Sequence, residues 1–197
     1  MGRTSDAKAR ILRSAQELFY ARSTENVGVQ EICDHAGVKK GSFYHYFPSK
    51  QKLTLEVAED YRRCSAKALS EEVFCSDIPP LQRIEGLFQY VYLFHKKVKA
   101  ETGKVQGCLN VNLSTELSTQ EASIREKICE SFSGGIAPIE AALSEAVEKG
   151  DLREMDTQAK AEAIFVYLQG AVMMAKAQND PEVIFRLAKE VKNFVEA

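Results

Sequence analysis

The sequence predicts an all-α fold in which an N-terminal three-helix domain (residues 1–52) precedes a C-terminal helical bundle (residues 53–197). Three observations predict it. Apolar residues recur at three- and four-residue spacing along nearly the whole chain. Alternating strand patterns and Asn-Gly hairpin turns are missing. After the first helix, two short helical segments are joined by a tight glycine-containing turn, as in a helix-turn-helix.

Length and composition indicate an ordinary globular protein. The 197 residues are 45% hydrophobic and 27% charged, and a chain of this length buries roughly 70% of its unfolded surface without metals or disulfides. The longest apolar run, 164–175, is too short for a bilayer. The five cysteines are widely spaced, with no C-x-x-C pair. We therefore expect a cytoplasmic protein with reduced thiols, and no metal, cofactor or membrane.

Turn residues place the boundaries of the first four helices. The first helix runs from about 5 to 22, and Gly37 ends the next, over 29–36. Pro48 ends a helix over 40–47, because proline cannot continue it. A long helix then begins at Ser49 and ends near 71, before the proline-containing loop 76–80.

The remaining helices are placed by apolar stripes. One stripe covers 84–98, and a short helix follows Cys108. A longer helix is expected over 121–149, broken or kinked by Gly134, Gly135 and Pro138. The last two helices, 157–177 and 181–195, are the most apolar, so we expect them to need partners on more than one side.

Charge is unevenly distributed along the chain. Residues 1–52 carry nine Lys or Arg and five Asp or Glu, a net of +4, whereas the remainder carries 17 and 23, a net of −6. A basic N-terminal segment followed by an acidic remainder is typical of a protein that binds a polyanion through its N-terminal part. In a helix-turn-helix the second short helix lies in the DNA major groove.

The motif itself lies in residues 30–50, QEICDHAGVKKGSFYHYFPSK, and resembles the signature of TetR-family transcriptional repressors over about 5–60. The resemblance implies a palindromic double-stranded DNA operator as partner. Because Gly41 has no side chain, its helix can approach the duplex closely. Neighbouring side chains then reach base edges or phosphates. The candidate DNA-binding residues are Gln30, Lys39, Lys40, Gly41, Ser42, Tyr44, His45, Tyr46 and Lys50. The apolar residues of the same motif, Ile32, Val38, Phe43 and Phe47, are expected to form the small core instead.

Two positions depart from the family pattern. Val27-Gly28 stands where the family usually has Ser or Thr as helix cap, and Lys39 stands where a small hydroxyl residue is common. Glycine still caps a helix at a cost of a few tenths of a kcal/mol. A phosphate contact from a hydroxyl is thereby lost, and the Lys39 charge is a candidate replacement.

Two segments of the body resemble the N-ethylmaleimide-responsive branch of the family, which senses electrophiles and oxidants through a reactive cysteine. They are GCLNVNLSTE, 107–116, and GAVMMAK, 170–176. Cys108 opens a predicted helix, where unpaired amides favour the reactive thiolate. If Lys176 lies nearby, it could lower the pKa of this thiol or react with an oxidised sulfur. The alternative for each cysteine is a buried, inert side chain.

The family also implies a homodimer in which the last two helices of each chain form a four-helix bundle. A competing regulatory site is an apolar pocket that takes a small-molecule inducer. Its candidate lining is Tyr90, Phe94, His95, Asn112, Phe132 and Tyr167, whose alternative role is plain core. Three functions stay open: a thiol-switched repressor, a ligand-induced repressor and an enzyme with Cys108 as nucleophile. For the enzyme alternative, the sequence contains no local motif that would supply a general base beside Cys108.

Overall fold

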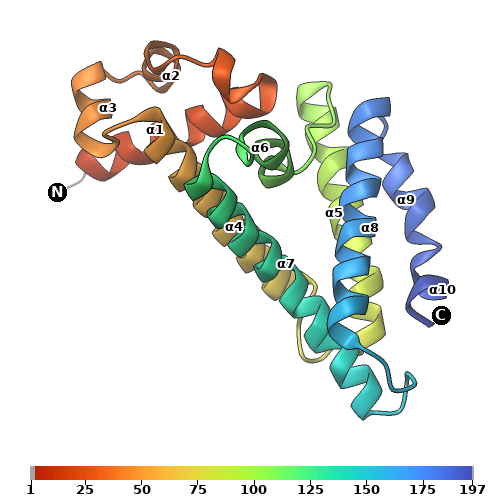
Figure 1. The fold of residues 1–197 in the computed structure, drawn as a ribbon. Helices are drawn as coiled ribbons and strands as arrows, with labels where there is room; N and C mark the ends of the chain where they lie inside the picture. Colours follow the sequence, from red (N-terminus) through yellow and green to blue (C-terminus); the bar gives the residue numbers. More distant parts are fainter. Residues whose placement is uncertain (1–2, 197) are drawn as a thin grey trace. The chain divides into compact units, whose positions relative to one another are not determined.

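The computed structural model describes residues 3–196, and every regular element in that range is a helix. The contacts within the chain define two compact units (Figure 1). Unit 1 contains the chain up to residue 62 together with 109–131, and unit 2 contains 63–108 and the chain from 132 onwards. The contacts thus divide the chain differently from the sequence-based boundary at residue 52, because 109–131 groups with the N-terminal helices.

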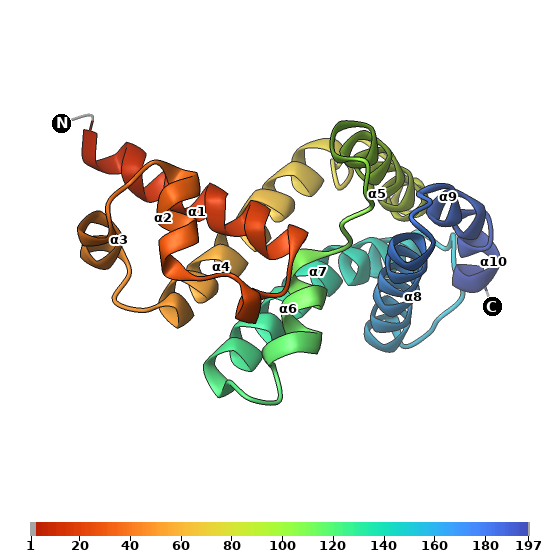
Figure 2. The ribbon, with the colours of Figure 1, turned by 90° about the horizontal axis from the view of Figure 1, so that it is seen from above.

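Unit 1 is built from a helix-turn-helix and its supporting helices. Its elements are α1 (Arg3–Ala21), the 3-10 turn η1 (Thr24–Asn26), α2 (Val29–Ala36), α3 (Lys40–Tyr46), the start of α4 (Lys50–Glu72), α6 (Leu109–Leu117) and the start of α7 (Ala122–Glu148). Helix α1 packs on α2 and α3, and Figure 2 shows α3 at the outer edge of the unit. The arrangement leaves one side of α3 open.

A small apolar core holds α1 to α4 together. Ile11, Ile32, Phe43, Phe47 and Leu53 are all fully buried. Ile32 and the two phenylalanines had been expected there, and the structure confirms them. Full burial of such side chains contributes roughly 1.5–3 kcal/mol each, so α3 is rigidly supported from below.

Unit 2 consists of the end of α4, α5 (Pro80–Thr102), the remainder of α7, α8 (Thr157–Gln178), α9 (Glu182–Ala188) and α10 (Val191–Glu196). Helix α9 packs against both α5 and α8. Phe88, Ile139, Leu143, Ile164 and Ile184 lie at the centre of its core. No helix within the described range is long and apolar enough to cross a membrane.

Helix α7 is continuous, so the expected break at Gly134, Gly135 and Pro138 is wrong. A Cβ atom added to Gly135 would lie 2.7 Å from the Phe165 ring of α8. Gly135 therefore makes room for a neighbouring helix and does not end its own. The sequence could not distinguish these two roles, since helix-breaking and close packing use the same residue.

The C-terminal segment forms two helices where one was expected over 181–195. In a continuous helix the Leu187 carbonyl would accept the Val191 N–H. It accepts instead from the Glu190 N–H at 3.1 Å and from the Tyr167 hydroxyl at 3.0 Å. A tertiary hydrogen bond from α8 thus accompanies the break between α9 and α10.

Two polar side chains hold the loops of unit 2. Arg83, almost fully buried, donates to the Ile78 carbonyl at 2.6 Å and to the Ser76 carbonyl at 2.9 Å, and it pairs with Glu145 of α7 at 2.6 Å. Asn179 ends α8 in the left-handed conformation, with φ 50°. Its side-chain oxygen accepts the Val105 N–H at 2.8 Å, which fastens the segment before Cys108 to the end of α8.

Candidate nucleic-acid interface and regulatory residues

The turn between α2 and α3 depends on Gly37. This residue has φ 64°, a left-handed conformation that glycine adopts without strain, and its N–H donates to the Asp34 carbonyl at 3.2 Å. The Val38 N–H then returns to the Cys33 carbonyl at 2.9 Å, which completes the end of α2. Helix α3 begins two residues later, so its orientation relative to α2 is fixed.

The outer side of α3 carries most of the predicted DNA-binding residues. Lys40, Gly41, Tyr44 and His45 are exposed, with Tyr44 at 53% of its full surface, and Ser42 is half-buried. A Cβ added to Gly41 would meet no atom of this chain within 4 Å. The glycine is therefore not required by the packing of the described chain around it.

Other predicted contact residues lie around this surface. Lys39 is exposed at the N-cap of α3, and Tyr46 is half-buried at the end of the helix. Gln30 is exposed on α2, where its amide donates to Asp34 Oδ1 at 2.7 Å. This hydrogen bond orients the Gln30 side chain along its own helix.

Lys50 is engaged within the chain. Its ammonium donates to the Thr24 carbonyl at 2.8 Å and to the Val27 carbonyl at 3.1 Å. These carbonyls belong to the segment that leads into α2. Lys50 therefore holds that segment against α4, a role that its position after Pro48 did not indicate.

Sequence reasoning missed the part that α6 takes in unit 1. Glu116, near its end, accepts hydrogen bonds from Ser23, Thr24 and the Glu25 N–H. Burial alone would raise the pKa of Glu116, but these hydrogen bonds outweigh it and hold the pKa below its usual value. No local motif marks the residue, because its partners are about 90 positions away.

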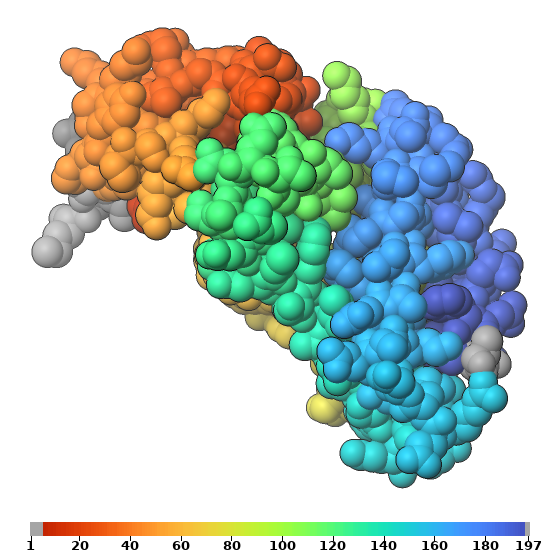
Figure 3. Space-filling view, in the orientation of Figure 1, coloured from red at the N-terminus to blue at the C-terminus, as the bar shows by residue number. Residues whose placement is uncertain are grey.

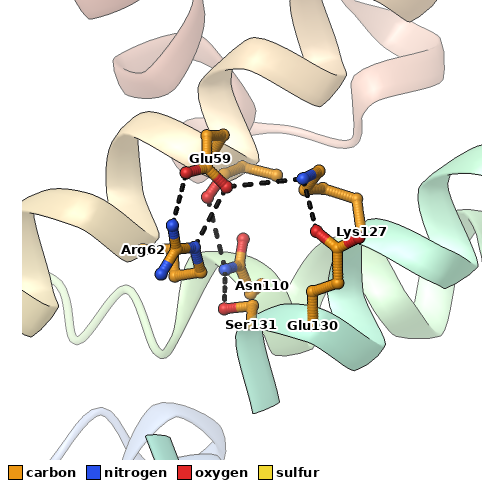
Figure 4. Close-up of polar contacts among 7 residues, drawn as sticks. Glu59, Arg62, Asn110, Lys127, Glu130 and Ser131 are labelled. Carbon is orange, nitrogen blue, oxygen red and sulfur yellow. Dashed lines mark hydrogen bonds and ion pairs between the residues drawn. The ribbon is translucent and has the colours of Figure 1, made fainter. Parts of the chain in front are cut away.

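A second polar cluster joins α4 and α7 (Figure 4). Arg62 pairs with Glu59 at 2.5 Å, and Lys127 lies 3.6 Å from Glu59 and also pairs with Glu130. The hydrogen bond from Arg62 lowers the pKa of Glu59. The four charges alternate in sign, so the cluster holds the two helices together without a net charge.

Asn110 lies beside this cluster, on the first turn of α6. Its amide nitrogen donates to the Ser131 hydroxyl at 2.6 Å and to the Ala58 carbonyl at 3.4 Å (Figure 4). Its side-chain oxygen is buried without a partner among the described residues. One amide thus links α6 to both α4 and α7.

Cys108 is half-buried immediately before α6 and packs against the core of unit 2. Gly107, with φ 79°, forms the bend that leads into it. Lys176 lies on α8 in the same unit, and burial lowers the pKa of its ammonium. Among the other thiols, Cys64 and Cys129 are exposed and Cys33 is buried.

Of the six candidate pocket residues, Asn112 belongs to unit 1 and the other five belong to unit 2. Tyr167 stacks on Phe194, and Phe132 packs on Phe165, so both hold helices together. Phe94 is exposed, and burial raises the pKa of the half-buried Tyr90.

His95 is the most distinctive member of that set. It is 3% exposed, and its Nδ1 has no hydrogen-bond partner within residues 3–196. Burial lowers its pKa to about 4, which keeps the imidazole neutral at pH 7. Within the same range, no group of three or more His, Cys, Asp or Glu is placed to hold a metal ion.

A rigidly supported helix-turn-helix with a basic, open recognition helix defines a DNA-binding transcriptional regulator. The family model described as bacterial regulatory proteins of the tetR family matches residues 11–57, and the tetracyclin repressor-like C-terminal domain model matches 80–191. The chain therefore belongs to the TetR family. Regulators of this family bind DNA operators and typically act as dimers.

Two of the similar proteins are described as repressors. The HTH-type transcriptional repressor DhaR of Mycobacterium sp. (strain GP1) is 26% identical over 183 residues, 92% of this chain and 88% of DhaR. The repressor NemR of Escherichia coli (strain K12) is 26% identical over 195 residues, 96% of this chain and 94% of NemR. The crystal structure of reduced E. coli NemR matches with a TM-score of 0.82 at 26% identity, covering 96% of this chain and 97% of that one. These matches make the chain a TetR-family transcriptional repressor and support the branch to which 107–116 and 170–176 pointed.

Proposed function

We propose that this repressor acts as a homodimer on a palindromic operator and is released when an electrophile or oxidant modifies Cys108. The observation that carries the DNA-binding part is the outer side of α3. There Lys40, Gly41 and Tyr44 face away from the chain, while Phe43 and Phe47 anchor the helix from beneath. A helix held in this way enters the major groove without having to be ordered first.

The side chains of α3 divide by reach and chemistry. Lys40 and Ser42 flank Gly41 and are assigned to base edges, whereas Tyr44, His45 and Tyr46 are assigned to phosphates. Gln30 and Lys39 extend the same surface onto α2 and the turn. Lys50, with two N–H groups on backbone carbonyls, supports the interface from behind.

The dimer interface is assigned to α8 and to the α9–α10 segment. Val166 and Met173 of α8 are 67% and 59% exposed, and a Cβ on Gly170 between them would have no neighbour within 4 Å among the described residues. These three positions share one side of the helix, by their spacing of four and three residues. In Figure 3, side chains of α8, in blue, lie at the surface of unit 2. A second copy would bury the stripe and bring two helices close together at Gly170.

Cys108 is favoured as sensor by its position. It immediately precedes α6, and the unpaired amides of a helix N-terminus favour a thiolate; it also follows a bend at Gly107. Val105 lies three residues before Cys108, and Asn179 lies three residues after Lys176. The Val105 N–H donates a hydrogen bond to the Asn179 side chain. The thiol and the amine are therefore expected near each other, which supports Lys176 as part of the sensor.

A reversible ligand is the second candidate inducer, and His95 is what favours it. A neutral, buried imidazole with an unpaired nitrogen is suited to accept or donate one hydrogen bond to an uncharged small molecule. An enzyme with Cys108 as nucleophile finds no support in relatives that are transcriptional regulators.

The DNA-binding proposal is tested by selecting bound duplexes from a random pool and measuring affinity for the selected sequence. We expect a palindrome whose half-sites are about 34–36 Å apart or a multiple of that distance. Lys40→Ala and Tyr44→Ala should weaken binding, and a Lys97→Ala variant, exposed on α5, should not. Selection of no preferred duplex by the wild-type protein would refute the proposal.

The sensor proposal is tested by release from that operator with N-ethylmaleimide. Cys108→Ser should still bind the operator but no longer be released. Because Cys64 and Cys129 are exposed and will also be alkylated, an adduct map alone decides nothing, so Cys64→Ser and Cys129→Ser serve as matched controls that keep the response. Release of Cys108→Ser at the wild-type concentration of reagent would overturn Cys108 as the sensor.

A further inference from the structure

One carboxylate oxygen of α6 binds three residues at the start of the η1 turn of unit 1. Glu116 Oε1 accepts hydrogen bonds from the Ser23 hydroxyl at 2.7 Å, from the Glu25 N–H at 3.0 Å and from the Thr24 hydroxyl. Hydrogen bonds to an ionised acceptor are roughly twice as strong as those between neutral groups. Three consecutive residues are thus fixed to a single point.

The held segment lies directly before α2, the first helix of the helix-turn-helix. Thr24 is only 2% exposed, and its carbonyl accepts the Lys50 ammonium from another direction. Lys50 and its two acceptors lie in the N-terminal part of the chain, whereas Glu116 is 93 positions from Ser23. The Glu116 contact is therefore an attachment of the DNA-binding helices to a distant part of the chain.

Helix α6 is itself fixed at its beginning. Asn110 donates to Ser131 of α7 and to the Ala58 carbonyl of α4. Cys108, the last residue of unit 2 before the chain enters unit 1, immediately precedes α6. The nine-residue helix α6 is thus held by hydrogen bonds at both ends.

We propose that Glu116 is a positioning residue for operator binding: it fastens the helix-turn-helix to α6, so that the two recognition helices of a dimer keep the spacing of a palindromic site. The inference rests on the proposed function. Helix α4 is the covalent connection between the helix-turn-helix and the rest of the chain. The Glu116 contact adds an attachment to the 109–131 segment, beside the hydrogen bond from Gln51 to Glu121 at 2.6 Å.

The consequence differs between two kinds of DNA. A duplex with one half-site binds the helix-turn-helix of one subunit only. Its affinity therefore does not depend on the distance between the two helix-turn-helix units of the dimer. A full palindrome binds the helix-turn-helix of both subunits at once. Its affinity depends on the fraction of dimers in which the two recognition helices have the spacing of the half-sites. Loss of the contact should therefore weaken binding to the palindrome and spare the half-site.

The experiment compares both duplexes, with the half-site flanked by scrambled sequence of equal length. We expect Glu116→Ala to lose about tenfold in affinity for the palindrome, within the usual range for coupled sites, and about twofold or less for the half-site. Glu116→Gln keeps one acceptor oxygen without the charge and should lie between. Glu126→Ala removes an exposed carboxylate of α7 in the same unit and should match the wild type.

Removal of the donors supplies the second arm. Ser23→Ala with Thr24→Val should also reduce affinity for the palindrome, and adding it to Glu116→Ala should cause no further loss, because both changes break the same contact. Additive losses would show that Glu116 acts through other partners. Thermal unfolding of each variant confirms that the comparison is between folded proteins.

The outcomes separate this inference from the proposed function. Equal affinities of wild type and Glu116→Ala for the palindrome, or an equal loss on both duplexes, would overturn the positioning role. A wild-type protein that does not prefer the palindrome over the half-site would overturn the proposed function, and the positioning role with it.

Discussion

At the scale of single residues, composition and spacing were a better guide to the exposure of a side chain than to its hydrogen-bond partners. The exposed side of α3 lies where the motif placed it, and Phe43 and Phe47 are buried as expected. For Lys50 and Tyr167, the sequence did not predict the hydrogen-bond partners. Their long side chains turn to backbone carbonyls of other segments, Thr24 for one and Leu187 for the other. Such contacts follow from tertiary packing, which no local pattern records.

His95 gives a prediction about pH. Its pKa is about 4 in the folded protein, against 6.5 for an ordinary histidine, so folding favours the neutral form. Below pH 6.5 the unfolded chain takes up a proton that the folded protein does not, and stability falls until about pH 4. The free energy of unfolding of the wild type, relative to His95→Gln, should decrease by about 2 kcal/mol between pH 7.5 and pH 5. Urea unfolding at the two pH values measures it.

A pH-independent difference between the two proteins would contradict this prediction. It would mean that water or a polar group reaches the imidazole in solution. The comparison also bears on the reversible-ligand candidate, since a histidine that readily takes up a proton would select for anions instead of neutral molecules.

At the scale of helices, local signals predicted some boundaries well. Helices α2, α3 and α4 begin and end within about two residues of the expected positions, because Gly37 and Pro48 act through backbone geometry alone. The missed break between α9 and α10 and the continuity of α7 both involve contacts with α8. Sequence reasoning therefore failed where a neighbouring helix decides the outcome.

Gly135 tests that conclusion. Alanine there should gain up to about 1 kcal/mol in helix propensity, yet its Cβ would lie 2.7 Å from the Phe165 ring. We expect overpacking to prevail, lowering the free energy of unfolding by about 1–3 kcal/mol in urea titrations. Phe165→Leu, added to Gly135→Ala, should recover part of the loss.

Gly86→Ala is the matched control within α5. A Cβ at Gly86 would lie 3.7 Å from Val73, an ordinary contact, so this change should be neutral or stabilising. If Gly135→Ala behaved in the same way, Gly135 would not be needed for the packing of α7 against α8.

At the scale of the whole molecule, the open stripe on α8 predicts the oligomeric state. Val166→Asp or Met173→Asp would place a charge at the centre of the proposed interface, where an unpaired charge is costly. We expect either change to weaken the dimer at least about a hundredfold. Sedimentation equilibrium should then give the mass of one chain, 22.0 kDa, at concentrations where the wild type is a dimer.

Ala141→Asp adds the same charge to an exposed position of α7 and should leave the dimer intact. A wild-type protein that sediments as a single chain at every concentration would rule out the interface. It would also remove the reason for a palindromic operator.

The origin of Glu116 in a segment far from the helix-turn-helix limits how this protein can be recombined with its relatives. Grafting residues 1–62 onto another repressor's body would bring Ser23 and Thr24 without the carboxylate that binds them. A hybrid made at this boundary should recognise its sequence with poor discrimination between half and full sites. Carrying residues 109–131 along with the head would restore it, so the unit that evolution or an engineer can exchange is discontinuous in sequence.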